Sequence, residues 1–251
     1  MAAARVIHCF SNPRSASTAL MYAFKSRGDC AVVDEPLYAS YLAATGLDHP
    51  MREEVLESQP RDLAEAVAAI TTGPTRAALQ YQKHMTHHVL ADAELGWLSR
   101  LRHAFLIRDP RRVVASYAKK RGRPTLEDLG YPQQVRIYEH LRAVGRTPPV
   151  VVAEDVLRDP RRVLSALCEA LDVAFDEAML SWSPGPRASD GVWGSHWYRA
   201  VWRSTGFDPP RQDLPGLEDD LADLAARCEP YFQRLLADRL SPTERHGNHT
   251  V

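Results

Sequence analysis

The sequence predicts an α/β protein built in three layers, with helices covering both faces of a parallel β-sheet. Short apolar runs of strand length recur along the chain, and stretches with helical spacing of apolar residues lie between them. Strands and helices that alternate in this way favour a parallel sheet buried on both faces. The chain has 251 residues, of which 45% are hydrophobic, and this is enough for one such domain. The expected strands are 5–10, 31–33, 77–82, 103–107 and 150–153.

Length and charge narrow the function classes. We expect residues 1–240 to form a single domain and residues 241–251 to form a polar, disordered tail. A formal net charge of −1 gives no general attraction to nucleic acid or to an anionic membrane. No run approaches the ~18 apolar residues that span a bilayer, and the N-terminus does not read as a leader. We therefore expect a soluble, cytoplasmic protein that binds neither nucleic acid nor membrane, and no sequence feature indicates its oligomeric state.

The four cysteines do not form a recognisable framework. They are Cys9, Cys30, Cys168 and Cys228, and no two of them are close in sequence. A disulfide scaffold or a zinc site needs closer, regular spacing, so we expect buried, reduced thiols.

The first expected strand leads into the most informative stretch, Phe10 to Leu20, which reads FSNPRSASTAL. A strand, a loop of small residues and a helix together bind phosphate, because loop N–H groups and the helix dipole point at the anion. Ser15, Ser17 and Thr18 add hydroxyl donors, and Arg14 adds a positive charge. The loop is not the G-x-x-x-x-G-K-[ST] loop of nucleotide hydrolases, since Ser17 stands where the Lys belongs. A serine-rich loop that merely caps a helix is the alternative.

The second expected strand ends at Asp34-Glu35-Pro36. In an open α/β sheet, ligands gather at the carboxyl ends of the strands, which places Glu35 near the Arg14 loop. A carboxylate there is available as a general base. The alternative is that Glu35 only precedes a helix and interacts with its dipole.

The third expected strand ends in Lys83-His84-Met85-Thr86-His87-His88. Three imidazoles and one ammonium at a strand end favour catalysis by Lys83 with one histidine. His84 and His88 are four residues apart, which also suits zinc, but the Glu of H-E-x-x-H is missing and we expect no metal. At least one imidazole is expected to be structural, and we assign that role to His87.

The fourth expected strand, 103–107, runs directly into Arg108-Asp109-Pro110 and a helix that carries Ser116. Arg108 offers a bidentate fork for phosphate, and Ser116 lies about two helical turns on, where its hydroxyl can face the same anion. The same Arg-Asp-Pro motif recurs at Arg158-Asp159-Pro160, but there it follows a helical turn and indicates an ordinary helix start. The strand context therefore singles out Arg108.

These motifs together resemble the P-loop sulfotransferases, and in particular small, soluble, bacterial-type members. The family's 5′-phosphosulfate loop is commonly P-[KR]-S-G-[ST]-[ST], and here Pro13 to Thr18 reads PRSAST, with Ala16 in place of Gly. If that position needs a positive φ, Ala16 is costly there. The resemblance implies that Arg14, Ser15, Ala16, Ser17 and Thr18 hold the 5′-phosphosulfate of 3′-phosphoadenosine 5′-phosphosulfate. It also implies that Arg108 and Ser116 hold its 3′-phosphate, and that no metal is needed.

The resemblance assigns catalytic roles as well. Many members carry a strand-ending Lys with a His two residues later, the Lys touching the transferred group and the His acting as base. Here Lys83 matches, but the His is one residue on, at His84, and Met85 occupies the expected position. We therefore expect Lys83 to stabilise the leaving oxygen and either Glu35 or His84 to remove the acceptor proton.

Residues 182–207 hold four of the five tryptophans together with several Gly and Pro, and we expect a long lid loop with a short helix. In sulfotransferases a loop in this part of the chain supplies a basic residue to the 3′-phosphate, which here indicates Arg203, Ser204 and Thr205. The lid's Trp193, His196 and Trp197, with His88, are expected to line the acceptor pocket. Packing of the aromatic rings against the core is the alternative.

The expected function is therefore transfer of a sulfuryl group to a hydroxyl or amine of a small-molecule acceptor. Two other classes stay open. A P-loop kinase for a small metabolite needs a loop Lys and a magnesium-holding carboxylate, and the Lys is absent from the loop. A sulfotransferase-like protein without activity would bind the donor and not turn it over.

Overall fold

Five parallel strands form the centre of the molecule. The computed structural model describes residues 4–75 and 77–241. The sheet order is β2-β3-β1-β4-β5, and every strand pairs in parallel with its neighbours. The strands are β1 (Arg5–Ser11), β2 (Cys30–Asp34), β3 (Leu79–Met85), β4 (Arg102–Ile107) and β5 (Val150–Val152). The predicted α/β class and parallel sheet are confirmed, with strand ends shifted by up to three residues.

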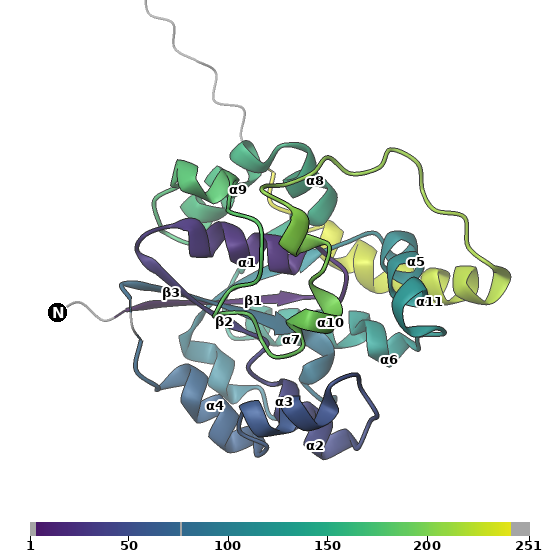
Figure 1. Cartoon of the computed structure of the whole chain (residues 1–251), viewed down its shortest axis with the longest axis horizontal. Coiled ribbons are helices and arrows are strands. Elements are labelled where there is room, and N and C mark those ends of the chain that lie inside the picture. The colour runs from purple at the N-terminus through teal and green to yellow at the C-terminus, as the bar shows by residue number, and fades with distance from the viewer. Residues whose placement is uncertain (1–3, 76, 242–251) are drawn as a thin grey trace, which may run out of the picture.

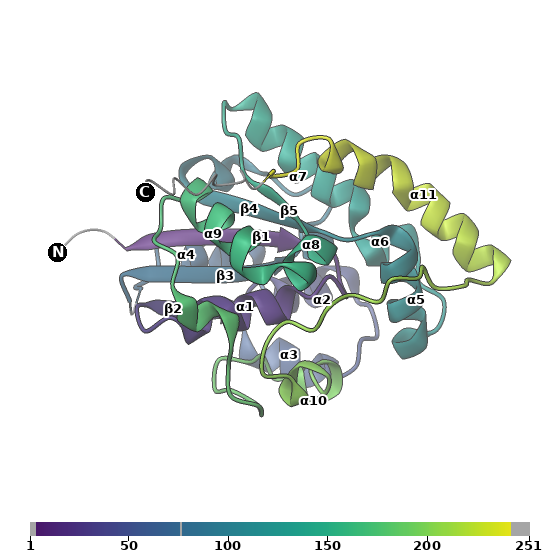
Figure 2. The same ribbon diagram turned by 90° about the horizontal axis from the view of Figure 1, so that it is seen from above.

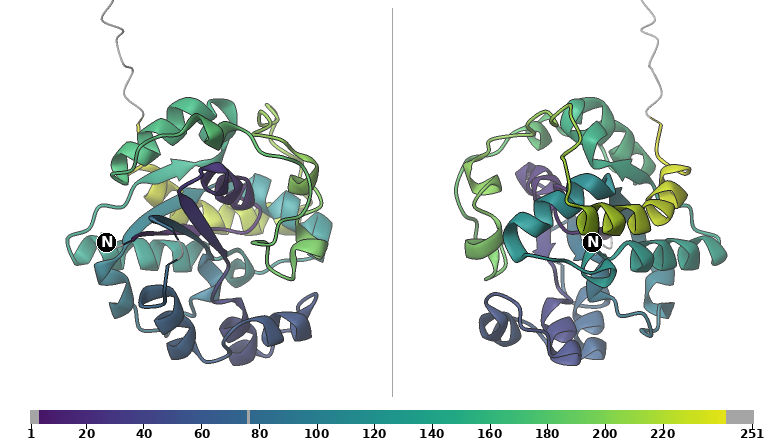
Figure 3. Two further views of the ribbon diagram at one scale, coloured as in Figure 1. Left: turned by 60° about the vertical axis from the view of Figure 1, so that its left-hand side comes forward. Right: turned by 90° about the vertical axis from the view of Figure 1, so that its right-hand side faces the viewer.

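Helices cover both faces of the sheet, as Figures 1 and 3 show for α1 and α4, which lie on opposite sides of the strands. Side chains alternate between the faces, so Ile7 and Cys9 face one layer while Phe10 faces the other. The first layer contains α1 (Ser17–Ser26), α8 (Ala153–Arg158) and α9 (Pro160–Ala170). The second contains α4 (Leu63–Thr71), α5 (Pro110–Arg121), α7 (Tyr131–Ala143) and α11 (Asp219–Leu236).

The remaining elements are short and lie around the sheet's carboxyl edge or in connections. The α-helices are α2 (Tyr38–Thr45), α3 (Arg52–Ser58), α6 (Leu126–Leu129) and α10 (Gly194–Trp197). The 3₁₀ turns are η1 (Thr86–His88), η2 (Gly96–Arg100), η3 (Glu177–Leu180) and η4 (Val201–Arg203). A separate apolar cluster joins α2 and α3 to the lid. In Figure 2, which is seen from above, α10 lies in front of α3.

Strand register sets the positions of the polar strand ends. Ser11 at the end of β1 pairs with Met85 of β3, and Asp34 at the end of β2 pairs with Lys83. The loop before α1, Glu35 and the start of α5 therefore emerge at one edge of the sheet, where ligands bind in open α/β folds.

The lid, residues 182–207, is closed at its base. Ser181 and Gly206 form an isolated antiparallel bridge, and the Trp182 N–H donates to the Thr205 carbonyl at 3.0 Å. Farther along, the Asp190 carboxylate accepts hydrogen bonds from the Tyr22 hydroxyl of α1 and from the lid's own Trp202 indole, both at 2.8 Å. The lid is therefore anchored to the sheet layers at several points.

Other sequence expectations have simple outcomes. All four cysteines are free and buried, as predicted. Among the described residues, no helix has the length and apolar character needed to cross a membrane. The expected polar tail, apart from Ser241, lies outside the described residues.

Candidate active site

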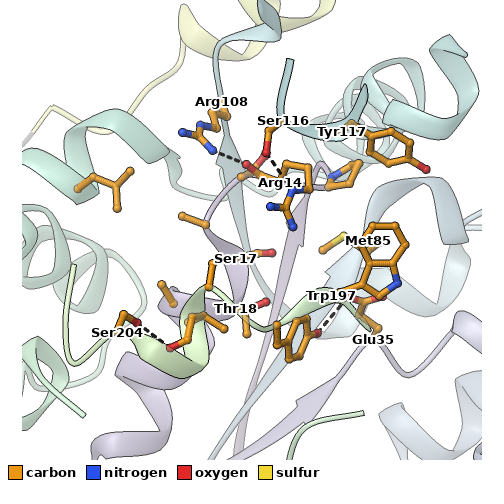
Figure 4. Close-up of a pocket in the computed structure, with 18 of the residues that line it drawn as sticks. Arg14, Ser17, Thr18, Glu35, Met85, Arg108, Ser116, Tyr117, Trp197 and Ser204 are labelled. Atoms are coloured by element: carbon orange, nitrogen blue, oxygen red, sulfur yellow. Dashed lines mark hydrogen bonds between the residues drawn. The ribbon is translucent and has the colours of Figure 1, made fainter. Parts of the chain in front are cut away.

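A cavity of about 580 Å³ opens at the carboxyl edge of the sheet. Its size is within the ~300–1,000 Å³ typical of small-molecule sites. The loop before α1, the start of the segment after β2, helix α5 and the lid all contribute to its wall (Figure 4). The predicted residues that line it are Arg14, Ser15, Ala16, Ser17, Thr18, Glu35, His88, Arg108, Ser116, Trp197 and Ser204.

The loop before α1 has the left-handed backbone that a nest of N–H groups requires. Arg14 has a φ of 62° and Ala16 a φ of 60°, and α1 begins at the next residue, Ser17. The departure from Gly at Ala16 therefore falls at a position where an L-residue is strained. The Ser15 hydroxyl is buried, lines the cavity and has no hydrogen-bond partner among the described residues. A polar ligand in the cavity would satisfy that hydroxyl.

The two predicted anion motifs meet in this cavity. Arg14 Nε donates to Ser116 Oγ at 3.0 Å, and the Arg108 guanidinium donates to the Arg14 carbonyl (Figure 4). Burial lowers the pKa of Arg14, and the nearby Arg108 lowers it further. Arg108 also pairs with Glu154 at 3.1 Å, which offsets part of its charge, yet Arg108 still lines the cavity. Two guanidinium groups this close to each other favour an anion beside them.

Glu35 and Lys83 form a buried ion pair. Their side chains approach within 2.7 Å, and Lys83 Nζ lies equally close to Asp34 Oδ1. Lys83 also donates to Thr18 Oγ1 at 3.3 Å. Burial alone would lower the pKa of Lys83, but the two carboxylates raise it overall, so Lys83 is an ammonium. The pKa of Glu35 is raised, chiefly by burial and partly by Asp34, against the opposing effect of Lys83.

Lys83 does not reach the cavity as the sequence led us to expect. Its side chain is 1% exposed and lies beneath Thr18 and Glu35, which do line the cavity. Direct contact of Lys83 with a transferred group is therefore not what the structure shows. Glu35, with a φ of 41°, is turned toward the cavity instead.

Aromatic and imidazole side chains form the wall on the Glu35 side. His88 stacks on Tyr38 with ring centroids 4.4 Å apart, and the Tyr38 hydroxyl is 2.7 Å from His49 Nδ1. Nδ1 of His88 and Nε2 of His49 are buried without partners among the described residues. Burial lowers the pKa of His49 to about 4, so its imidazole is neutral. Tyr117, Met85 and Trp197 complete this side.

Comparison with known proteins identifies the family. A sequence profile of the family described as "Sulfotransferase domain" matches residues 5–238. The chain is a member of the sulfotransferase family. The predicted family is therefore confirmed.

Two curated relatives come from Arabidopsis thaliana. Branched-chain-amino-acid aminotransferase-like protein 1 is 41% identical over 94% of this chain and 42% of its own length. Branched-chain-amino-acid aminotransferase-like protein 2 is 36% identical over 92% of this chain and 41% of its own length. The chain thus spans about two-fifths of the length of these relatives.

Solved structures share the fold at low identity. The sulfotransferase domain from the Synechococcus PCC 7002 olefin synthase is 22% identical with a TM-score of 0.54, over 90% of this chain and 96% of the other. A sulfotransferase from Alicyclobacillus acidocaldarius is 14% identical with a TM-score of 0.57, over 94% and 95%. The sulfotransferase domain from the curacin biosynthetic pathway is 17% identical with a TM-score of 0.50, over 90% and 98%.

The assignment of His84 as a base is corrected. Neighbouring residues of a strand point to opposite faces, so His84 faces away from Lys83. It stacks on His8 with ring centroids 4.9 Å apart and is 1% exposed within the core. Met85, two residues after Lys83, lines the cavity instead. His87, expected to be structural, lines the cavity as well, so the core imidazole of the three is His84.

The lid assignments are corrected in part. Arg203 and Thr205 are exposed and do not line the cavity, whereas Arg211, a few residues after the lid, does. Trp193 is buried behind the wall, where its indole donates to the Tyr198 hydroxyl at 3.0 Å. His196 also lies outside the lining.

Sequence reasoning missed several site residues, namely Asp34, Tyr38, His49, Tyr117, Tyr198 and Arg211. Asp34 carries a detectable signal, because it directly follows the apolar run 31–33 and stands beside Glu35. Tyr198 and Arg211 lie in irregular segments, where no periodicity indicates which side chains face inward.

Proposed function

We propose that this protein transfers a sulfuryl group from 3′-phosphoadenosine 5′-phosphosulfate to a hydroxyl or amine of a small molecule. The observation that carries the proposal is the meeting of Arg14 and Arg108 in one cavity with Glu35. A donor with phosphate groups at two positions needs two anion sites, and a sulfuryl acceptor needs a base nearby. The cavity supplies both.

The donor is a substrate, and the residues present fit it. The N–H groups of the Arg14–Ser17 loop, together with the Ser15, Ser17 and Thr18 hydroxyls, would hold the 5′-phosphosulfate. The partnerless Ser15 hydroxyl supports this role. Arg108 and Ser116 would hold the 3′-phosphate.

The proposed reaction breaks one bond and forms one. The acceptor oxygen or nitrogen attacks sulfur while the bond from sulfur to the bridging oxygen breaks, and adenosine 3′,5′-bisphosphate leaves. Glu35 takes the acceptor's proton. Arg14 and the loop N–H groups stabilise the negative charge that develops on the departing phosphate. This role replaces the one that the sequence suggested for Lys83, which instead holds Glu35 and acts on the donor through Thr18.

The raised pKa of Glu35 sets the expected pH dependence. Only the ionised carboxylate accepts a proton, so the rate falls as pH drops through the Glu35 pKa. Glu35→Gln should abolish this limb and most of the turnover. Normal turnover in the Gln variant would remove Glu35 from the role.

The acceptor is proposed to be a small molecule with an apolar or planar face. The wall beside Glu35 consists of aromatic rings and imidazoles, such as Tyr38, Tyr117, Trp197 and His88. Rings of this kind pack against flat apolar groups, while the partnerless nitrogens of His49 and His88 can bond to hydroxyls.

Isothermal titration calorimetry tests the part of the proposal that concerns donor binding. Adenosine 3′,5′-bisphosphate should bind, and ATP with magnesium should bind more weakly or not at all. Arg108→Ala should weaken binding of the bisphosphate by about tenfold or more, because one charge-assisted hydrogen bond is lost. Arg158→Ala is the matched control, since Arg158 has the same following residues but pairs on the surface with Asp155 at 2.8 Å.

The other functions appear as distinct outcomes. Tighter binding of ATP with magnesium would favour a small-metabolite kinase. Binding of the bisphosphate without sulfuryl transfer to any acceptor, water included, would favour a binding protein. Equal effects of Arg108→Ala and Arg158→Ala would contradict the assignment of Arg108.

A further inference from the structure

Asp34 joins the lid to the sheet edge inside the protein. Its side chain is 1% exposed, and both of its oxygens accept hydrogen bonds. Oδ1 accepts from Lys83 Nζ at 2.7 Å, and Oδ2 accepts from the backbone N–H of Gly191 in the lid at 3.0 Å. The carboxylate that neighbours Glu35 in sequence is thus held by the lid.

The Tyr198 hydroxyl completes this group. It lies 2.7 Å from Asp34 Oδ2, to which it donates, and it accepts from Lys83 Nζ at 2.5 Å and from Trp193 Nε1 at 3.0 Å. One donor and two acceptor sites are all that a phenol hydroxyl offers, so every one is used. The same oxygen is 3.4 Å from Glu35 Oε1. A lid residue is therefore in contact with each member of the buried charge group.

We propose that Tyr198 is a positioning residue that fixes Lys83 and Glu35, so that the base is correctly set only when the lid is in place. The role of Glu35 as base rests on the proposed function. The effect of Tyr198 on Glu35 does not, because it follows from contacts within the protein.

The sharing of Lys83 between two carboxylates is the physical reason. The titratable groups that face Glu35 are Lys83 from β3, Asp34 from β2, Tyr38 from α2 and Tyr198 from the lid. With Tyr198 donating to Asp34, part of the Asp34 charge is balanced and Lys83 remains available to Glu35. Without that hydroxyl, Lys83 is drawn toward Asp34, and Glu35 loses part of its stabilising charge. Its proton affinity then rises.

The chain offers a matched pair of substitutions. Tyr198→Phe and Tyr22→Phe each remove one hydroxyl that donates to an aspartate holding the lid, Asp34 and Asp190 respectively. Both keep the aromatic ring and its packing. Only Tyr198→Phe removes a contact to Lys83 and Asp34. A general loosening of the lid should therefore change the Glu35 pKa in both variants, whereas a loss of Glu35 positioning should change it in Tyr198→Phe alone.

The test is a carbon-13 NMR titration of glutamate-labelled protein, with the Glu35 signal assigned from Glu35→Gln. In Tyr198→Phe the pKa of the Glu35 carboxyl should be higher than in the wild type by about 0.5 to 1. In Tyr22→Phe it should titrate as in the wild type. An unchanged Glu35 in Tyr198→Phe, or equal shifts in both variants, overturns the proposal.

A second variant guards against a folding failure. Trp193→Phe removes a donor to the Tyr198 oxygen and leaves the Asp34 bond in place, so it should shift Glu35 in the same direction by less. A second assay measures release of sulfate from the donor with water as acceptor. It tests the proposed function separately from the role of Tyr198. If the wild type releases none and binds no bisphosphate, the proposed function fails while the NMR result still decides the role of Tyr198.

Discussion

Replacing Ala16 by Gly tests whether the phosphate loop is strained by its own sequence. Ala16 has a φ of 60° and a ψ of 19°, and it immediately precedes the first residue of α1. The left-handed region costs an L-residue about 1–2 kcal/mol. Glycine removes that cost but loses about 0.5–1 kcal/mol more backbone entropy on folding than alanine does. The net gain in the free energy of unfolding should be about 0.5–1 kcal/mol.

The assay is equilibrium denaturation in urea without ligand, with the melting temperature as a second measure. A gain of this size raises the melting temperature by about 1–4 °C in a domain of this length. The control is Ala68→Gly on the exposed face of α4, where the same substitution should cost about 1 kcal/mol. Opposite signs support the strain at Ala16. If Ala16→Gly is destabilising like the control, the backbone there is not strained.

Two further predictions concern the lid end and the histidine core. Arg211→Ala should weaken adenosine 3′,5′-bisphosphate by roughly tenfold while Arg203→Ala has little effect, because only Arg211 lines the cavity; calorimetry giving the reverse order would restore the original assignment of Arg203. Burial lowers the pKa of His84 to about 3 and of His103 to about 4, below the unfolded value of ~6.5. The unfolded chain therefore binds more protons below that pH, and each buried histidine should remove about 1.4 kcal/mol of stability per pH unit as pH falls from 6.5 toward 4. Urea midpoints at several pH values measure this slope, and a slope unchanged in His84→Gln would show that His84 is protonated in the fold.

The sequence was most informative where structure is local. Apolar runs located all five strands, and the order of small and hydroxyl residues from Ser15 to Thr18 located the turn from β1 into α1 that lines the cavity. Arg108 was separated from Arg158 by the strand before it, because only a strand end delivers a side chain to the edge of the sheet. In each case the signal lies within about ten residues of the feature.

The misassigned residues failed for identifiable physical reasons. His84 was open to correction from sequence, since the alternation of a strand already places it opposite Lys83. Arg203 ends a single 3₁₀ turn and Arg211 lies in irregular backbone, so no periodicity indicates where their side chains point. The lid that contains Arg203 is anchored through Asp34 and Asp190. Those anchors are contacts between segments more than 150 residues apart, as for Asp34 and Gly191, and no local pattern records them.

The bridge between Ser181 and Gly206 has an evolutionary consequence. Because the two ends of the segment already meet, chains of other lengths can be exchanged between them at little entropic cost, which grows only with the logarithm of loop length. Under the proposed function, the range of acceptors can then change through replacement of this segment, while the residues proposed to bind the donor stay unchanged. Any successful replacement must still present a hydroxyl, or an equivalent donor, to Asp34, and that requirement limits which segments are viable.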